Sequence, residues 1–298
     1  MEAASLSLSL GFEDTHVVVT GGGGLIGRVV VDHFLAAGAR VSSLDIVHSD
    51  KRTDSEHKAD ADADTAATTA TKSNYQAIYC DVALQESIEA AFAAAVKAHG
   101  PVEICIALAS LDLSVLSPSS FAEASFAQLK RVLDVNVAGT WLTAREWMRG
   151  LRKASAEGTT LQHPNLIIIG SESGHFGERT NAEYSLGKSA VQGGLLMSLR
   201  AEAPRQWPGA RVNVVAPGPV QTERWYEECV RNPEQYYVEA QATTALAEPV
   251  PVRAVAMAIL SLASHNFSSH IHGQIVNVDG GKQGKVMWLE REVAGHRR

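Results

Sequence analysis

Residues 16–27, HVVVTGGGGLIG, join an apolar run directly to a glycine-rich turn. The run His16–Thr20 has the length and β-branched composition of a buried strand, and helical periodicity follows from Ile26 to Ala37. Glycine is needed where φ is positive and where backbone amides must approach a pyrophosphate closely. The following helix adds free N–H groups and a positive dipole end. The stretch therefore predicts a nucleotide-binding turn, although a merely tight strand–helix connection is the alternative.

Short apolar runs alternate with longer helical patterns throughout the chain. The runs are His16–Thr20, Arg40–Asp45, Tyr75–Asp81, Val102–Ala109, Asn165–Gly170, Arg211–Ala216 and Gln274–Val278. The helical patterns include Ile26–Ala37, Leu84–Ala98, Phe126–Arg149, Ala182–Ala203 and Val252–Ala263. Near-continuous Val and Ile indicates strands covered on both faces, as in a parallel sheet. We predict an α/β fold, a Rossmann-type doubly wound, seven-stranded parallel sheet in a single domain.

The composition argues against several functional classes. The 298 residues are 45% hydrophobic, and 26 Lys and Arg against 33 Asp and Glu leave a net charge of −7, which favours no nucleic-acid partner. No apolar run approaches the roughly 20 residues of a membrane helix, and the start MEAASLSLSLGFED lacks the regions of a signal peptide. Cys80, Cys105 and Cys229 are widely spaced, so neither a disulfide framework nor a metal site is expected. We expect a cytoplasmic enzyme.

Two segments depart from the alternation of strands and helices. Residues 46–74 are polar, rich in Ala, Asp and Thr, and without periodicity, so we interpret them as a flexible insertion in a domain spanning 12–284. Residues 285–298 form a C-terminal tail past the last predicted strand. Its Trp288 and Leu289 are candidates to cover a neighbouring subunit.

Acidic residues end the second and third predicted strands. Asp45 stands 18 residues after Gly27, where a carboxylate accepts hydrogen bonds from the adenosine ribose and repels the 2′-phosphate of NADP. We therefore predict NAD as the cofactor, with NADP less favoured; Lys51 and Arg52 would weaken that preference if they folded back. A turn-capping role for Asp45 is the alternative. Asp81 is predicted to lie beside the adenine ring, or else to cap the next helix.

Tyr184 and Lys188 lie four residues apart, on one face of a predicted helix. A phenol titrates near 10 and is a poor proton donor or acceptor at neutral pH, whereas a nearby ammonium lowers its pKa. Ser171 precedes Tyr184 by 13 residues and ends a strand at the carboxyl edge of the sheet, where ligands bind in open α/β folds. The three side chains therefore form a candidate catalytic set.

With these motifs the chain resembles the short-chain dehydrogenase/reductase family, in its single-domain branch, over about Thr15–Gly281. The resemblance is carried by Thr20–Gly27, Asp81, Asn136, Ser171, Tyr184 with Lys188, Pro217-Gly218 with Thr222, and Asn277–Gly281. It implies that Tyr184 is the general acid/base and that Ser171 orients the carbonyl or alcohol. It also implies that Lys188 binds the nicotinamide ribose and lowers the pKa of Tyr184, while Asn136 holds a water in the proton relay.

The resemblance further indicates which residues surround the cofactor. The expected set is Gly21, Gly24, Leu25, Ile26, Gly27, Asp45, Ile46, Asp81, Val82, Ala109, Tyr184, Lys188, Pro217, Gly218, Val220 and Thr222. Two departures from the family pattern concern cofactor binding. Leu25 stands where the family usually has a glycine, so the glycine spacing of Thr20–Gly27 matches that of the extended branch, which contains epimerases and dehydratases. In addition, Ala107–Ser110 stands where the family has N-N-A-G. The chain length and the ending Val278–Gly281 favour the short branch.

Residues 219–250 occupy the place of the family's substrate lid. Trp225, Tyr226, Tyr236 and Tyr237 gather there, which suits a ring-containing substrate or, equally, packing of the lid onto the domain. The predicted substrate-binding residues are Ser171, Ser173, His175, Tyr184 and Trp225.

The leading hypothesis is an NAD-dependent oxidoreductase that interconverts a small-molecule secondary alcohol and a ketone. The alternatives are an NADP-linked ketoreductase, a non-catalytic NAD-binding regulatory or scaffold protein, and, less favoured, a lyase or epimerase. The family resemblance also implies a homotetramer or homodimer built on the long helices 126–149 and 182–203.

Overall fold

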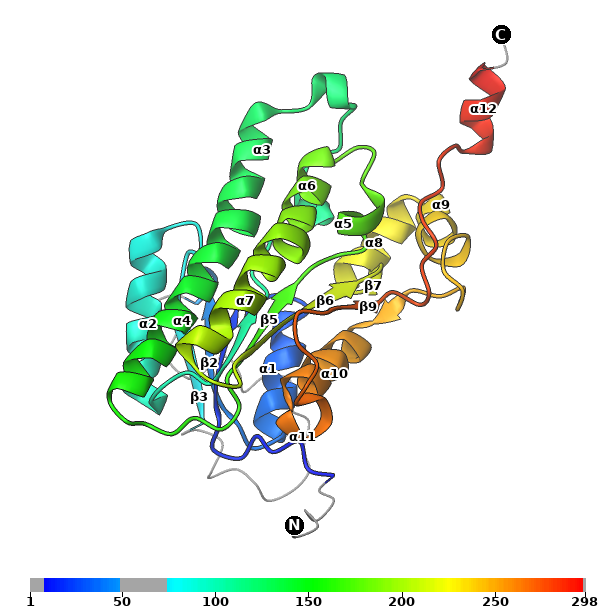
Figure 1. Ribbon diagram of the computed structural model, residues 1–298. Helices are drawn as coiled ribbons and strands as arrows, with labels where there is room; N and C mark the ends of the chain where they lie inside the picture. The colour runs from blue at the N-terminus through cyan, green and yellow to red at the C-terminus, as the bar shows by residue number, and fades with distance from the viewer. Residues whose placement is uncertain (1–7, 49–73, 297–298) are drawn as a thin grey trace.

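The computed structural model describes residues 8–48 and 74–296 and contains the predicted seven-stranded parallel sheet (Figure 1). Its strands are β1 (His16–Thr20), β2 (Arg40–Asp45), β3 (Tyr75–Tyr79), β4 (Ile104–Ala107), β5 (Asn165–Ile169), β6 (Arg211–Pro217) and β9 (Ile275–Val278). Their order is β3-β2-β1-β4-β5-β6-β9. The chain therefore switches direction across the sheet between β1 and β4, which is where such sheets open a crevice at their carboxyl edge. Most of the predicted insertion, with Lys51 and Arg52, lies outside the described residues.

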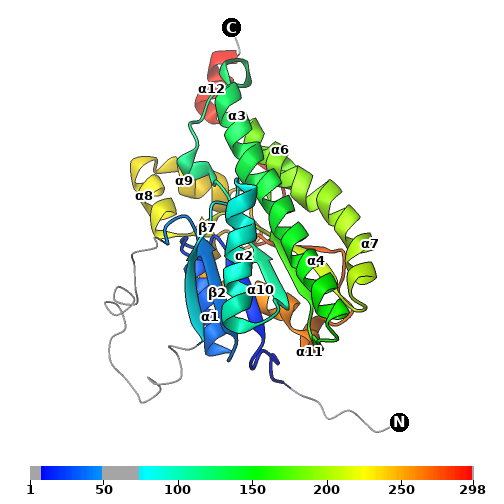
Figure 2. The ribbon, with the colours of Figure 1, turned by 90° about the vertical axis from the view of Figure 1, so that its left-hand side faces the viewer.

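Helices cover both faces of this sheet, as Figures 1 and 2 show from two sides. One layer includes α1 (Gly27–Ala36) and α10 (Val252–Ala263), and the other α2 (Gln85–His99), α4 (Thr140–Ala156) and α7 (Leu196–Gln206). Along β1, Val17 and Val19 pack toward the first layer and Val18 toward the second. Because alternate residues enter two separate cores, both must be apolar, which explains the near-continuous Val and Ile of the strands.

The two longest helical segments each contain a π-helical stretch. The first runs through α3 (Phe126–Val132), η4 (Leu133–Gly139) and α4, and the second through α6 (Ala182–Ala190), η5 (Val191–Leu195) and α7. Both extend beyond the predicted ends at Arg149 and Ala203. A π-turn accommodates one extra residue without interrupting the helix, so the apolar periodicity did not reveal it.

The segment after β6 leaves the sheet and returns to it. It contains β7 (Val220–Gln221), α8 (Glu223–Arg231), α9 (Glu234–Tyr236), η6 (Tyr237–Gln241) and β8 (Val250–Pro251). Because β7 pairs with β8, the two ends of the segment meet beside the sheet. The shorter elements are η2 (Leu113–Val115), η3 (Phe121–Glu123), α5 (Ser173–Phe176), α11 (His265–Ser268) and α12 (Glu290–His296). Within the described ranges, no helix has the length and apolarity to cross a membrane.

Candidate active site

A cleft of about 1370 Å³ runs along the carboxyl edge of the sheet, from the turn after β1 to the segment after β6. Every predicted site residue lines this cleft except Gly27, Asn136 and His175. The three exceptions lie in different places. Gly27 lies beneath the glycine turn and Asn136 behind the cleft wall, both buried, while His175 faces β9.

The glycine turn is shaped by two close backbone approaches. Gly21 has φ +70° and a Cβ there would lie 2.7 Å from the Ala109 Cα, while a Cβ on Gly27 would lie 2.0 Å from the Gly21 carbonyl oxygen. The Leu25 and Ile26 amides, at the start of α1, have no hydrogen-bond partner among the residues that the structure describes. Unpaired amides at a helix N-terminus form a cradle for a phosphate.

Asp45 lies at the end of β2, next to this turn. Its Oδ2 accepts a hydrogen bond from the Gly23 amide at 3.0 Å, and its Oδ1 accepts one from the Val47 amide at 3.1 Å. These bonds hold the carboxylate at the rim of the cleft, where the ribose of a dinucleotide is predicted. The carboxylate therefore both caps the turn and faces the cleft.

The residues after β3 and β4 form the next part of the cleft wall. Asp81 Oδ1 accepts a hydrogen bond from the Ala83 amide at 2.9 Å, whereas the N-cap position of α2 is Leu84. The Thr20 hydroxyl accepts hydrogen bonds from the Leu108 and Ala109 amides at 3.2 and 3.3 Å. Thr20 thus connects the loop after β4 to β1, although Ala107–Ser110 lacks the two asparagines of the family pattern.

Asn136 lies in η4 and is 1% exposed. Its Oδ1 accepts a hydrogen bond from the Leu111 amide at 2.8 Å, and its Nδ2 donates one to the Leu111 carbonyl at 3.0 Å. A single side chain therefore satisfies both backbone groups of one residue in the loop after β4. This contact holds the loop against the helix that faces Tyr184.

Ser171, Tyr184 and Lys188 come together at the centre of the cleft wall. Ser171 follows β5, and α6 carries Tyr184 and Lys188 one turn apart. Ser171 and Tyr184 both line the cleft, and the Ser171 hydroxyl is close enough to lower the pKa of Tyr184. The Lys188 Nζ lies 5.7 Å from the centre of the Tyr184 ring and donates to the Ile169 carbonyl at 3.0 Å. Two of its three donor hydrogens therefore remain for other partners.

Burial controls the protonation of this set. Desolvation raises the pKa of Tyr184 to about 12, although the nearby Ser171 hydroxyl lowers it. Desolvation also lowers the pKa of Lys188 to about 8. The expectation that Lys188 brings the pKa of Tyr184 below the ordinary phenol value is therefore wrong for this structure, because removal of the phenol from water outweighs the effect of nearby charges.

The predicted substrate residues divide between the cleft and its surroundings. Ser173 and Trp225 line the cleft, but the His175 Nε2 contacts the Asn277 Oδ1 at 3.1 Å because α5 turns this ring toward β9. Trp225 packs against Tyr226 and Tyr236 with ring centres 5.7 and 5.4 Å apart. None of Tyr226, Tyr236 and Tyr237 lines the cleft, so Trp225 is the aromatic residue of the segment 219–250 that faces the site.

The sequence reasoning missed four charged side chains that line the cleft near Ser171. They are Glu172, Glu178, Glu239 and Lys285. Glu172 could have been found, since it follows Ser171 directly. No local sequence pattern pointed to Lys285, because its partners lie more than 100 residues earlier in the chain.

A comparison with known proteins identifies the family of this chain. Residues 24–283 match a family model described as enoyl-(acyl carrier protein) reductase. The chain belongs to the short-chain dehydrogenase/reductase family. As a member of that family it is an oxidoreductase acting on CH–OH or C=O groups, in agreement with the resemblance seen in the sequence.

Members of the short-chain dehydrogenase/reductase family named for different activities resemble the chain. A 3-oxoacyl-[acyl-carrier-protein] reductase, MabA of Mycobacterium tuberculosis, is 27% identical over 68% of this chain and 75% of its own length. A 2,3-dihydroxy-2,3-dihydro-p-cumate dehydrogenase of Pseudomonas putida is 29% identical over 92% of this chain and 96% of its own length. The crystal structure of gox2181 superposes with a TM-score of 0.74, at 25% identity over 91% and 96% of the two chains.

Proposed function

We propose that the protein is an NAD-dependent oxidoreductase that interconverts a secondary alcohol and a ketone, with Ser171, Tyr184, Lys188 and Asn136 as its catalytic set. The observation that carries this proposal is that Ser171 and Tyr184 line the same cleft, close enough for the Ser171 hydroxyl to affect the pKa of Tyr184. Two hydroxyls converging on one point can bind a single substrate oxygen, and a phenol can then exchange its proton.

The residues present fit a nicotinamide dinucleotide. The glycine turn leaves a cradle that side chains at Gly21 or Gly27 would fill, and the open amides at the start of α1 suit a pyrophosphate. Asp45 would hold the ribose, Asp81 with Val82 the adenine, and the turn 217–222 the nicotinamide side. When bound, this group supplies or accepts the hydride.

The chain's own residues handle the oxygen and the proton. Ser171 and Tyr184 donate hydrogen bonds to a ketone oxygen, and Tyr184 passes its proton to that oxygen as it becomes an alkoxide. In the opposite direction the Tyr184 phenolate accepts the proton of the alcohol. Lys188, with two free donor hydrogens, would bind the ribose hydroxyls beside Tyr184, and Asn136 would hold a water of the proton relay.

The segment 219–250 would act as the substrate lid of the domain 12–284. Its ends are joined through β7 and β8, and Trp225 from α8 enters the cleft. A buried indole beside a polar wall suits a small molecule with a ring next to its hydroxyl or carbonyl group.

Cofactor preference tests the proposal directly. We expect the wild-type protein to bind NADH more tightly than NADPH in fluorescence titrations, because the Asp45 carboxylate repels a 2′-phosphate. Asp45→Ser removes that charge and frees the Gly23 and Val47 amides, so the NADH/NADPH affinity ratio should fall about 100-fold. Glu157→Ser, an exposed carboxylate at the end of α4, is the control. Tighter wild-type binding of NADPH would contradict the NAD assignment and favour the ketoreductase alternative.

We also propose that the protein is a homodimer or homotetramer. The outer faces of α4 and α7 form a shallow hollow that includes Trp141, Met148 and Leu199, with Trp141 exposed. Light scattering should give two or four times the chain mass, and Trp141→Glu should shift that mass toward the monomer. A wild-type monomer at micromolar concentration would contradict this assembly.

A further inference from the structure

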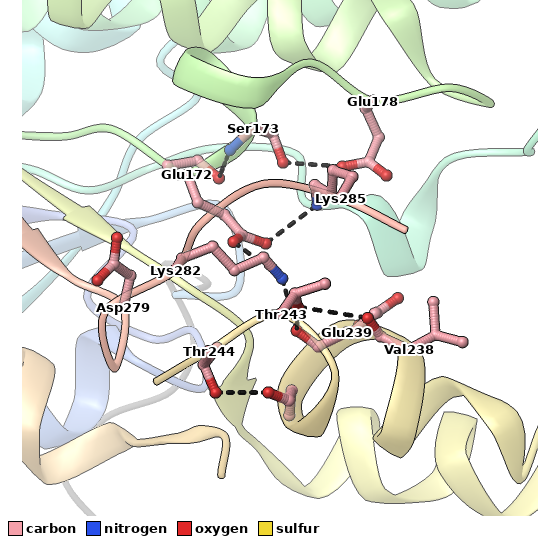
Figure 3. Close-up of polar contacts among 12 residues, drawn as sticks. Glu172, Ser173, Glu178, Val238, Glu239, Thr243, Thr244, Asp279, Lys282 and Lys285 are labelled. Atoms are coloured by element: carbon pink, nitrogen blue, oxygen red, sulfur yellow. Dashed lines mark hydrogen bonds and ion pairs between the residues drawn. The ribbon is translucent and has the colours of Figure 1, made fainter. Parts of the chain in front are cut away.

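A group of buried charges joins the C-terminal segment to the loop that carries Ser171 (Figure 3). The Lys285 Nζ lies 3.0 Å from the Glu172 Oε1 and 2.8 Å from the Glu178 Oε2. The Lys282 Nζ lies 3.1 Å from the Glu172 Oε2 and also donates to the Glu239 carbonyl. Lys285 therefore bridges two carboxylates of a segment more than 100 residues away in the chain.

These ion pairs are removed from solvent. The side chain of Glu172 is 7% exposed, that of Lys282 is fully buried, and that of Lys285 is 22% exposed. Burial by itself would lower the pKa of Lys285, but Glu172 and Glu178 raise it above its ordinary value, so the amine stays charged. Removing one member of a buried ion pair leaves an uncompensated charge, in contrast to the small effect of breaking an exposed pair.

The two carboxylates are linked to Ser171 through its neighbours in the loop. The Ser173 amide donates to the Ser171 Oγ at 3.2 Å, and the Ser173 Oγ donates to the Glu178 Oε2 at 2.9 Å. Glu172, the other partner of Lys285, directly follows Ser171 in the chain. Lys285 therefore holds both ends of the loop 171–178, which includes α5, and Ser173 passes this restraint to the Ser171 hydroxyl.

We propose that Lys285 is a positioning residue of the active site, which holds the loop 171–178 and places its positive charge in the cleft that Tyr184 lines. The catalytic part of this inference rests on the function proposed above. The restraint on the loop does not, because it exists in the protein without any cofactor or substrate.

The positive charge of Lys285 affects the pKa of Tyr184 in a direction that can be measured. The charged groups around Tyr184 are Lys188 on its own helix, Asp112 from the loop after β4, and Glu178 and Lys285 from the network. Asp112 and Glu178 raise the pKa of Tyr184, and Lys285 lowers it. Alcohol oxidation needs the phenolate, so its rate rises with pH toward the pKa of Tyr184.

Hydrogen exchange of the free protein tests the positioning role. In Lys285→Met we expect the amides of residues 171–178 to exchange about tenfold faster than in the wild type, because local opening of the loop becomes easier. Lys285→Arg keeps the charge and should restore most of the protection. The control, Lys153→Met, alters an exposed lysine on α4 and should leave the loop unchanged. Equal exchange in Lys285→Met and the wild type would overturn the proposal.

The pH profile separates the charge from a merely structural role. Both Lys285→Met and Glu178→Gln loosen the loop, so each should lower kcat about tenfold with a smaller effect on the KM for NAD. The ascending limbs of their pH profiles for alcohol oxidation should nevertheless move in opposite directions by about half a pH unit, to higher pH in Lys285→Met and to lower pH in Glu178→Gln. Limbs that move together would overturn the electrostatic part.

The outcomes also separate this inference from the proposed function. A wild-type protein that binds no NADH and oxidises no secondary alcohol would contradict the function, while hydrogen exchange would still decide whether Lys285 holds the loop. If Lys285→Met does not fold, Glu178→Gln provides the same exchange comparison, since glutamine keeps the size of the side chain and removes only the charge that pairs with Lys285.

Discussion

Replacing Tyr184 with phenylalanine is expected to lower kcat by about 10³-fold while NADH binding stays within a few-fold of the wild type. The phenyl ring can fill the same buried space beside Leu116 and Val132, where Tyr184 is 8% exposed. Only the hydroxyl is lost, and with it the group that exchanges a proton with the substrate oxygen. NADH absorbance during oxidation of a panel of secondary alcohols measures the first effect, and fluorescence titration measures the second.

Tyr226→Phe is the matched control for this variant. Tyr226 lies half exposed on the lid, outside the cleft, so loss of its hydroxyl should change kcat less than twofold. A Tyr184→Phe protein that retained wild-type turnover would remove the proposed acid/base. Loss of NADH binding in the same variant would instead point to a role in cofactor binding.

Gly27→Ala is expected to have the second large effect. The added Cβ would lie 2.0 Å from the Gly21 carbonyl oxygen, a backbone atom that cannot rotate away, so the glycine turn must open. We expect NADH affinity to fall by at least about 100-fold and the free energy of unfolding to fall by about 1–3 kcal/mol. Titration with NADH and denaturant unfolding measure the two effects separately.

Gly150→Ala provides the control for Gly27→Ala. A Cβ at Gly150, on α4, would meet no atom within 4 Å. Since alanine is the better helix former, this variant should be as stable as the wild type or up to about 1 kcal/mol more stable, with unchanged NADH binding. Normal NADH binding by Gly27→Ala would show that the close approach to Gly21 does not shape the cofactor site.

Most of the fold was predictable because its signals are local. Each apolar run is long enough to mark a strand, and all seven predicted strands occur in the sheet with ends shifted by at most two residues. The glycine turn, the acid at the end of β2 and the spacing of Tyr184 and Lys188 each lie within one strand–helix unit. Their placement on the carboxyl edge follows from the parallel topology alone.

The tertiary structure decided the features that depend on distant parts of the chain. The pKa of Tyr184 shifts upward because several elements bury the phenol, and the orientation of His175 depends on β9. Tyr226 and Tyr236 pack on Trp225 and do not line the cleft, a choice that the sequence left open.

The sequence by itself therefore determined the strand–helix succession, the glycine turn and the pairing of Tyr184 with Lys188, since backbone periodicity and spacing within one element are local properties. Only the tertiary structure placed Lys285 between Glu172 and Glu178, and Asn136 against Leu111. These contacts join segments whose separation in the chain follows no period, so they exist only once the sheet and its helices have packed.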